Sequence, residues 1–450
     1  MKVYFLTLGC RVNQYETDAL RSMFLERGHE LAEKPEDADC CVVNTCSVTS
    51  EADRKSRQML RKMARLNPGT IVVAAGCSAE TTDGKVAADI VAGTKERLTI
   101  VDRAEKLFAE RKDLTHEQEH VRPEVSKKDE FHDFGSVLSP EGCRAFMKIE
   151  DGCDSFCTYC IIPFARGRVA SRSPESCIKE ARYLAQNGFK EIIVSGIHLC
   201  SYGKDRGEDV MSLAKLLKQI DDTEGLERLR LGSLEPISMT DEFIDALAGL
   251  KHICPSFHLS LQSGSDSVLK RMNRHYDSKG YASRVKRLRE RFPDMSLTTD
   301  IIVGFPGETD EEFEETMSFA KEMGFARIHV FPYSLREGTK AASMEQVAHE
   351  VKKQRESRLL ALASDLSAEF AKAMTGRNED VLVEKVSGLT ASGYTRNYVR
   401  AEVLFDAGNG VPVPGDVIRG VVTGSKGAEI VLKNGLCFNK ETLQFKTQMC

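Results

Sequence analysis

Residues 153–160 read Cys153-Asp154-Ser155-Phe156-Cys157-Thr158-Tyr159-Cys160, so that three cysteines fall within eight positions. This spacing wraps a short loop around one metal centre, and thiolates are the ligands that hold iron in a cubane cluster. Three cysteines leave one iron of a [4Fe-4S] cluster without a protein ligand. A structural zinc site is the alternative, but such a site usually has four protein ligands, and no fourth cysteine or histidine lies close by. We therefore interpret Cys153, Cys157 and Cys160 as ligands of a cluster with one open iron.

The sequence that follows this loop alternates short β-rich runs with helical patterns. Six such units predict a partial (β/α)6 barrel over residues 139–374, and barrel enzymes place their chemistry at the carboxyl ends of the strands. A long helix is expected over residues 344–374, before Gly376. The six strands are expected at residues 146–149, 191–195, 229–233, 257–261, 297–303 and 328–333.

The first hundred residues alternate in the same way and predict an N-terminal parallel-sheet domain over residues 1–112. Cys10, Cys46 and Cys77 each stand two positions after the end of one of its expected strands. Because parallel strands present their carboxyl ends at one edge, three thiolates can converge there as a second metal site. The strands are expected at residues 3–8, 41–44, 71–75 and 90–92, and the helices at residues 15–27 and 50–66.

Two further regions complete the domain organisation. Residues 113–138 are polar with little periodicity and predict a linker. Residues 375–450 contain short strands, expected at 381–386, 398–404, 417–422 and 430–432, which predict a small C-terminal β-barrel. The fold class is therefore α/β, with an N-terminal parallel sheet, a central partial barrel and a C-terminal β-barrel.

Composition limits the class of protein. A chain of 450 residues with 41% hydrophobic and 29% charged residues can build about three globular domains. No apolar run is long enough to cross a membrane, and the opening eight residues are too short for a signal peptide. We expect a cytoplasmic protein with no membrane partner, in which the fourteen cysteines bind metal or stay buried instead of forming disulfides. The net charge of −5 still permits a local basic stripe.

The cysteine loop at the start of a βα barrel resembles that of the radical S-adenosylmethionine (SAM) superfamily. In that superfamily the open iron chelates SAM, and one electron cleaves it to methionine and a 5′-deoxyadenosyl radical. The segments at residues 7–17, 44–46 and 75–77 resemble the N-terminal domain of the methylthiotransferases, whose three cysteines bind an auxiliary cluster. Matching segments in the barrel lie at residues 161–167, 195–198, 261–265, 300–309 and 331–334.

This resemblance implies two [4Fe-4S] clusters and SAM as cofactors, with transfer of a methylthio group to an adenosine in tRNA. The opening segment, Thr7 to Thr17, is similar to the bacterial MtaB branch, which modifies N6-threonylcarbamoyladenosine beside the anticodon. Residues 381–384 and 393–398 resemble a TRAM domain, a small RNA-binding barrel. The implied partners are the anticodon stem-loop of tRNA and an electron donor such as a flavodoxin or ferredoxin, while the sulfur donor stays open.

Other functions remain as alternatives. Within the family the target can instead be isopentenyladenosine in tRNA or an aspartate of a ribosomal protein. A different class is a non-catalytic RNA-binding protein with structural clusters, which the open iron argues against. If the C-terminal barrel binds RNA, a chain that ends after Met374 should lose more tRNA binding than SAM cleavage.

Candidate cofactor contacts follow from strand ends. Ser195 and Gly196 end the second barrel strand, where the resemblance implies a backbone contact with the SAM amino group. Glu235, Gln262 and Asp300 lie at or just beyond strand ends, where barrel enzymes keep ligand contacts, although each can equally satisfy neighbouring backbone groups. No catalytic residue is assigned.

Several residues have an ordinary structural interpretation beside a functional one. His198 and His258 are expected to be packed histidines. Basic residues after Cys46 can face a phosphate backbone or simply be a solvated helix face: Arg54, Lys55, Arg57, Arg61, Lys62 and Arg65. Arg166, Arg168 and Arg172 are equally ambiguous. The cysteines outside both triplets are expected to be buried thiols: Cys40, Cys41, Cys143, Cys177, Cys200, Cys254, Cys437 and Cys450.

Overall fold

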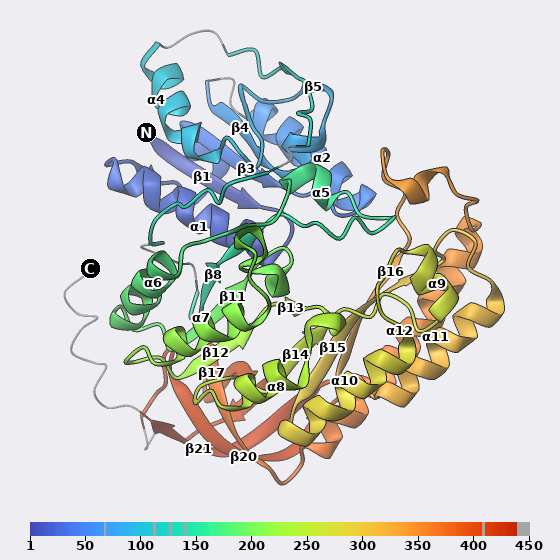
Figure 1. Cartoon of the computed structure of the whole chain (residues 1–450). Helices are drawn as coiled ribbons and strands as arrows, with labels where there is room; N and C mark the ends of the chain where they lie inside the picture. Colours follow the sequence, from blue (N-terminus) through green and yellow to red (C-terminus); the bar gives the residue numbers. More distant parts are fainter. Residues whose placement is uncertain are drawn as a thin grey trace.

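The structure is a computed structural model that describes residues 1–66, 69–110, 114–125, 128–137, 140, 142–406 and 410–438, with side chains up to Lys433. Figure 1 shows three parts along the chain, with the N-terminal domain above the central barrel and the C-terminal strands below it. This arrangement confirms the predicted α/β class and the order of the three parts. Among the described residues, no helix combines the length and the apolar character needed to cross a membrane.

The N-terminal domain is a five-stranded parallel sheet with the order β2-β1-β3-β4-β6. Every residue of β3 and β4 is buried, because helices cover both faces of the sheet. The strands are β1 (Lys2–Thr7), β2 (Glu30–Leu31), β3 (Cys40–Thr45), β4 (Ile71–Gly76) and β6 (Ile90–Ala92). The helices are α1 (Arg11–Glu26), α2 (Ser50–Leu66), α3 (Cys77–Thr81) and α4 (Ile100–Glu110).

The predicted linker is not a free connection. It contains the short strand β7 (Gln118–His120), which pairs with β5 (Gly84–Val86) of the N-terminal domain. Asp129 accepts hydrogen bonds from Lys95 Nζ at 2.6 Å and from the backbone of Arg168 at 2.8 Å, so it joins the N-terminal domain to the barrel. The polar composition that suggested a linker therefore reflects bonded side chains. Residues 113, 126–127 and 138 of the predicted segment lie outside the described residues.

The central part holds the six predicted barrel strands in two parallel sheets, β12-β11-β8 and β13-β14-β15-β16. The third predicted strand, 229–233, is split at Gly232, whose N–H still donates to the carbonyl of Val194 at 2.8 Å. β12 therefore continues the first sheet while β13 begins the second. The strands are β8 (Ala145–Lys148), β11 (Glu191–Ser195), β12 (Arg228–Leu231), β13 (Ser233–Leu234), β14 (Ser256–Leu259), β15 (Ser296–Val303) and β16 (Arg327–Pro332).

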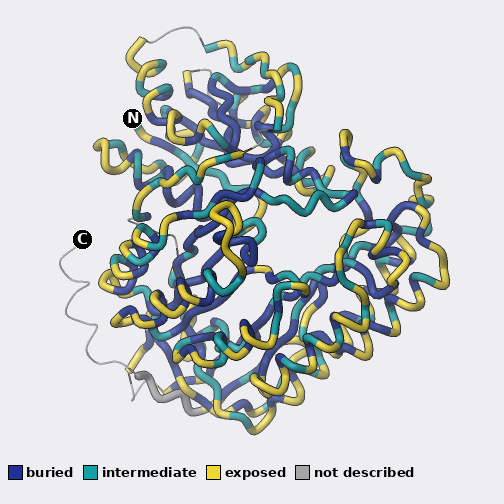
Figure 2. Tube along the Cα trace, in the orientation of Figure 1, coloured by how far each residue is buried: buried dark blue, intermediate teal, exposed yellow. Residues whose placement is uncertain are grey.

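Helices cover the outer side of these strands, and Figure 2 shows buried strands inside an exposed helical surface. Local caps fix their starts: Ser173 caps α6, and Thr309 with Glu312 forms a capping box on α11. The short pair β9 (Glu150–Asp151) and β10 (Ala170–Ser171) flanks the cysteine loop. The helices are α5 (Ile162–Arg166), α6 (Pro174–Gln186), α7 (Met211–Asp221), α8 (Asp241–Ala248), α9 (Asp266–Arg271), α10 (Ser278–Arg291), α11 (Asp310–Met323) and α12 (His349–Ala373).

The C-terminal part is a closed five-stranded barrel with the order β17-β18-β19-β21-β20. The sequence predicted four of these strands and missed β18, because Gly393 interrupts its pattern. That glycine is required by packing: a Cβ there would lie 1.8 Å from the carbonyl oxygen of Leu382 on the neighbouring strand. The strands are β17 (Asn378–Ser387), β18 (Thr390–Thr395), β19 (Arg400–Leu404), β20 (Val417–Lys426) and β21 (Glu429–Phe438).

This C-terminal barrel is docked firmly against the central strands. Arg228 Nη2 donates to the carbonyl of Asp380 at 2.7 Å, and Arg230 Nη1 donates to that of Arg396 at 2.9 Å. Both guanidinium groups are buried, and they share the carboxylate of Glu191 on β11, at 3.6 Å from Arg228 and 2.9 Å from Arg230. The C-terminal barrel therefore closes the amino-terminal end of the central barrel.

Candidate active site

Cys10, Cys46 and Cys77 lie at the carboxyl ends of β1, β3 and β4 and line one cavity of about 950 Å³. Gly9 allows the first two cysteines to approach, since a Cβ at that position would lie 3.1 Å from Cys46 Sγ. Asn13 Nδ2 donates to the carbonyls of Leu8 at 2.7 Å and of Thr45 at 3.0 Å. These bonds hold the two cysteine-bearing turns side by side.

The chemistry of these thiols fits a metal centre. Burial raises the pKa of Cys77 to about 12, and the neighbouring Cys10 and Cys46 contribute to the increase while Arg166 opposes it. Thiols packed this closely disfavour one another's ionised form. Bound iron reverses that preference, because metal coordination requires thiolates.

The second group, Cys153, Cys157 and Cys160, lies in the loop between β9 and α5. Gly152 starts this loop with φ +78°, and a Cβ there would lie 1.9 Å from the carbonyl oxygen of Arg168. Only glycine therefore fits at this position. Burial raises the pKa of Cys160 to about 12, and Cys157 adds to this increase. The three half-buried thiols thus also suit a bound metal cluster.

Arg274 connects the cysteine loop to a predicted cofactor contact. Its Nη1 donates to Cys157 Sγ at 3.1 Å, and its Nη2 lies 2.8 Å from Glu235 Oε1. Glu235 Oε2 also lies 3.2 Å from His198 Nε2. Burial opposes ionisation of Glu235, but His198 and Arg274 together lower its pKa below the ordinary value. Sequence reasoning missed Arg274, which is 114 residues beyond the loop and carries no spacing signal.

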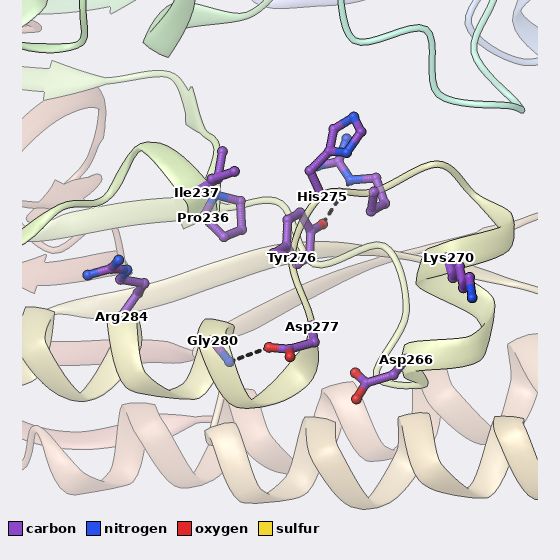
Figure 3. Close-up of a pocket in the computed structure, with 10 residues that line it drawn as sticks. Pro236, Ile237, Asp266, Lys270, His275, Tyr276, Asp277, Gly280 and Arg284 are labelled. Atoms are coloured by element: carbon purple, nitrogen blue, oxygen red, sulfur yellow. Dashed lines mark hydrogen bonds between the residues drawn. The ribbon is translucent and has the colours of Figure 1, made fainter.

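A shallower cavity of about 490 Å³ lies behind Arg274 (Figure 3). The Tyr276 ring lies beside Pro236, the His275 ring projects away from it, and Lys270 and Arg284 stand on the two helices beside the cavity. Arg274 Nε donates to the Tyr276 hydroxyl at 3.0 Å, and that hydroxyl donates to the carbonyl of Ser260 at 2.8 Å. This side therefore positions Arg274, while none of the six predicted cluster cysteines lines the shallower cavity.

The other predicted cofactor contacts take different places. Ser195 and Gly196 line the large cavity, and a Cβ on Gly196 would lie 2.6 Å from Glu150 Oε2. Gln262 is not among the described residues that line this cavity. Its backbone instead continues the ladder with β15, as its N–H donates to the carbonyl of Asp300 at 2.9 Å. Gln262 holds φ +70°, which strains a residue with a side chain.

Asp300 lines the large cavity together with His258 and His329. One ligand atom of each lies within 4.8 Å of the other two, so this half-buried set can accept a metal ion. His258 already bonds through both ring nitrogens, to Thr298 Oγ1 at 3.0 Å and to Asp300 Oδ2 at 3.2 Å. Sequence reasoning predicted Asp300, treated His258 as packed and missed His329, because the three residues come from three different strands.

A buried charge cluster joins the N-terminal domain to the barrel. Arg166 Nε donates to Cys77 Sγ at 3.1 Å, and its Nη1 donates to Glu16 Oε1 at 2.8 Å and to Asp151 Oδ1 at 3.0 Å. Arg97 and Lys148 pair with the same two carboxylates. Three cations against two carboxylates leave one formal positive charge beside the cavity. We call these five side chains the charge cluster: Glu16, Arg97, Lys148, Asp151 and Arg166.

The basic run after Cys46 lies on α2 and is partly neutralised. Arg54 pairs with Glu51, and Arg57 pairs with Asp53. Arg61, Lys62 and Arg65 are exposed along the same helix and border a depression of about 650 Å³. The run is therefore a surface feature in which two of the six basic residues have acidic partners within the helix.

The remaining arginines and cysteines are mostly structural. Arg172 is buried against Glu180, whereas Arg168 is more exposed and lies 3.5 Å from Asp154. Cys143 is half-buried, and five further thiols are buried as expected: Cys40, Cys41, Cys177, Cys200 and Cys254. The side chain of Cys437 and the whole of Cys450 lie outside the described residues.

Comparisons with known proteins cover most of the chain. Residues 147–320 match the Radical SAM superfamily, and residues 2–93 match Uncharacterized protein family UPF0004. The chain is 41% identical over 409 residues to the threonylcarbamoyladenosine tRNA methylthiotransferase MtaB of Bacillus subtilis (strain 168), covering 88% of this chain and 89% of that protein. It is 37% identical over 412 residues to the tRNA-2-methylthio-N(6)-dimethylallyladenosine synthase of Clostridium botulinum (strain Langeland), covering 87% and 90%.

A solved structure shares the fold at lower sequence identity. The radical S-adenosylmethionine methyltransferase TsrM from Kitasatospora setae matches with a TM-score of 0.53 and 16% identity. The match covers 76% of this chain and 77% of that chain. It supports the arrangement of a barrel beneath an N-terminal α/β domain.

Proposed function

The chain belongs to the radical SAM methylthiotransferase family, and from this membership we propose that it converts N6-threonylcarbamoyladenosine beside the tRNA anticodon to its 2-methylthio derivative. The observation that carries the substrate is the 41% identity, over 88% of the chain, to a relative named for that nucleoside. The related synthase at 37% identity is named for dimethylallyladenosine, also called isopentenyladenosine, which is therefore the second candidate. An aspartate of a ribosomal protein is a third target within the family.

The radical SAM family uses a [4Fe-4S] cluster and SAM, and we propose that Cys153, Cys157 and Cys160 hold that cluster. We propose that Cys10, Cys46 and Cys77 hold a second one. Together these groups supply, when bound, a 5′-deoxyadenosyl radical that opens the adenine C2–H bond and the sulfur that becomes the methylthio group. The gathering of each set of three thiols supports this assignment.

The chain's own residues position these groups. We propose that Arg274 and Arg166 each stabilise one sulfur, since they donate to Cys157 and Cys77. Ser195 and Gly196 would bind the SAM amino group from the wall of the large cavity. Glu235 would orient Arg274 and His198 beside the cofactor, because its carboxylate already bonds both.

The remaining predicted contacts and partners are also part of the proposal. Gln262 would position Asp300 through the backbone, and Asp300 would face the substrate. The C-terminal barrel and the basic residues Arg61, Lys62 and Arg65 would contact the phosphate backbone of the anticodon stem-loop. A flavodoxin or ferredoxin would supply electrons, and the reaction would take place in the cytoplasm.

Nucleoside analysis tests the substrate directly. The tRNA of cells lacking the gene should lose 2-methylthio-N6-threonylcarbamoyladenosine and accumulate its unmethylthiolated precursor, as measured by mass spectrometry. Return of the gene should restore the product. Loss of the 2-methylthio-isopentenyladenosine nucleoside instead would replace the proposed substrate by the second candidate.

Cysteine variants test the two cluster assignments. The anaerobically reconstituted protein should hold about eight irons, since each cubane contains four. Replacement of Cys153, Cys157 and Cys160 by Ala should halve the iron and abolish SAM cleavage. Replacement of Cys10, Cys46 and Cys77 by Ala should also halve the iron but leave 5′-deoxyadenosine formation measurable. Loss of SAM cleavage in the second variant, with its barrel cluster intact, would contradict this division of roles.

A further inference from the structure

The large cavity has two chemically different ends. Cys10, Cys46 and Cys77 line one end, beneath the sheet of the N-terminal domain. At the other end, β14, β15 and β16 contribute His258, Asp300 and His329, and the C-terminal barrel contributes Tyr398. We call this second end the inner pocket. The inner pocket is polar and charged, and none of the six predicted cluster cysteines lies in it.

Two guanidinium groups of the cavity have no acidic partner. Arg11 follows Cys10 directly, and Arg327 begins β16. Neither guanidinium makes a hydrogen bond or ion pair with a residue that the structure describes; Arg11 is half-buried and Arg327 is exposed at the edge of the cavity. Arg11 lies with its guanidinium carbon 5.5 Å from the centre of the Tyr398 ring, so it extends to the floor of the cavity.

The charges of Arg11 and Arg327 both act on His329. His329 is half-buried, and burial lowers its pKa, while Arg327 and Arg11 lower it further. Asp300 opposes that effect. Arg11, Arg327 and His329 line the same cavity, and Arg11 lies over the Tyr398 ring of the inner pocket. Asp300 is itself bonded to His258 at 3.2 Å, which occupies one of its oxygens.

The other arginines of the cavity lining already have acidic partners. Arg230 donates to Glu191 Oε1 at 2.9 Å, and Arg400 lies 3.3 Å from Glu429. Arg166 is occupied within the charge cluster. Arg11 and Arg327 are therefore the two guanidiniums of the described cavity lining that have no acidic partner, and a ligand with a negative group could pair with them.

We propose that the inner pocket, with Arg11 and Arg327 as its two cations, binds the carboxylate of the N6 substituent of the substrate adenosine. This inference rests on the proposed function and deepens it. A guanidinium bound to a carboxylate gains charge-assisted hydrogen bonds, and Asp300 offers an acceptor to the N–H groups of the carbamoyl linkage. The isopentenyl group has no polar atom. Its burial here would remove water from two guanidiniums without replacing the lost hydrogen bonds.

A phosphate group of the RNA carries the same charge and is the competing source of the anion. Chemical variation of the carboxylate separates the two sources. The probes are three anticodon stem-loop RNAs of one sequence: with N6-threonylcarbamoyladenosine, with the same nucleoside in which the carboxylate is a carboxamide, and with unmodified adenosine. All three carry the same phosphates.

The experiment measures the dissociation constants of the three RNAs for the anaerobically reconstituted protein and for Arg327→Gln and Arg11→Gln. The wild-type protein should bind the carboxylate RNA about tenfold more tightly than the carboxamide RNA, which is the effect of about 1.4 kcal/mol. In either variant this ratio should fall toward one. Arg358→Gln is the matched control, because Arg358 pairs with Glu314 on the outer helices and should keep the wild-type ratio.

Each outcome decides one statement. If Arg327→Gln and Arg11→Gln keep the wild-type ratio with full iron content, the inner pocket does not bind the carboxylate. If the wild-type ratio is one while the carboxylate RNA is still methylthiolated, the inference is wrong and the proposed function stands. If the wild-type protein neither prefers nor modifies the carboxylate RNA over unmodified RNA, the proposed substrate itself is wrong.

Discussion

At the scale of single residues, Arg166 connects the two groups of predicted cluster cysteines. Its guanidinium contacts Cys77, Asn13, Glu16 and Asp151, and the side chain is fully buried. It stands six positions after Cys160, so it ties the cysteine loop of the barrel to the cysteines of the N-terminal domain. The sequence marked Arg166 only as one of three ambiguous basic residues, because its partners are distant in the chain.

Replacement of Arg166 by Gln should therefore be costly. Arg97 and Lys148 still balance Glu16 and Asp151 after this change, but the two carboxylates lose their hydrogen bonds from Arg166, each worth about 1.5–3 kcal/mol. We expect a lower melting temperature and less iron bound after reconstitution. Arg168→Gln is the control, since Arg168 is more than one-third exposed. Equal melting temperatures for the two variants would show that the charge cluster does not hold the domains together.

Glu379 on β17 provides a pH-dependent contribution to stability. Burial raises its pKa to about 7, with Asp294 and Asp380 adding to the increase and Arg377 opposing it. The unfolded chain releases this proton near pH 4.5, so the folded state binds more protons between pH 4.5 and 7. The free energy of unfolding therefore falls as the pH rises through this window.

Glu379→Gln should remove that part of the pH dependence. The variant should lose less melting temperature than the wild type between pH 5 and 8, because Gln carries no charge to bury. Glu369→Gln, which changes an exposed carboxylate on α12, should follow the wild-type profile. Parallel profiles for all three proteins would mean that Glu379 titrates normally in the folded state.

At the scale of elements, the cysteine loop depends on one glycine. Gly152→Ala places a methyl group against the backbone of Arg168, where no side chain can move aside. We expect the loop to shift. The protein should then bind about half as much iron and should lose SAM cleavage. Gly188→Ala tests the backbone effect alone, since Gly188 has a similar φ of +84° and no atom within 4 Å of the added Cβ. A loss of iron in Gly188→Ala as well would assign the effect to general instability.

The elements also show how far the sequence could be interpreted. Cys10, Cys46 and Cys77 were predicted to converge because parallel strands end at one edge, which is a property of the backbone alone. The split between β12 and β13 was not predictable, since it depends on how Gly232 meets the neighbouring strand. The inner pocket was not predicted either, because its side chains come from separate strands and have no common spacing in the sequence.

At the scale of the whole molecule, the C-terminal barrel is part of the site. Tyr394 and Tyr398 stack with ring centres 4.6 Å apart and line the large cavity. Arg228 and Arg230 are buried under this barrel and donate to its carbonyls. The sequence predicted a small RNA-binding barrel here, and the structure adds that its residues form the floor of the cavity.

A chain ending after Met374 should therefore lose more than tRNA affinity. Without the C-terminal barrel, water enters the cavity and Arg228 and Arg230 lose acceptors worth about 1.5–3 kcal/mol for each hydrogen bond to a charged group. We expect a lower melting temperature and weaker SAM cleavage alongside weaker tRNA binding. An unchanged melting temperature with SAM cleavage intact would instead mean that the central barrel is stable and active without the C-terminal barrel.

The charge cluster also has a consequence for descent within the family. Its side chains come from α1, from the segment before α4, from β8 and β9, and from α5, so they are spread over residues 16–166. A recombination event that exchanged the first hundred residues for those of another lineage would separate Glu16 and Arg97 from Lys148, Asp151 and Arg166. Such a hybrid would inherit an unbalanced set of buried charges unless both parents carried the same five residues. The N-terminal domain and the central barrel of this protein are therefore expected to be inherited together.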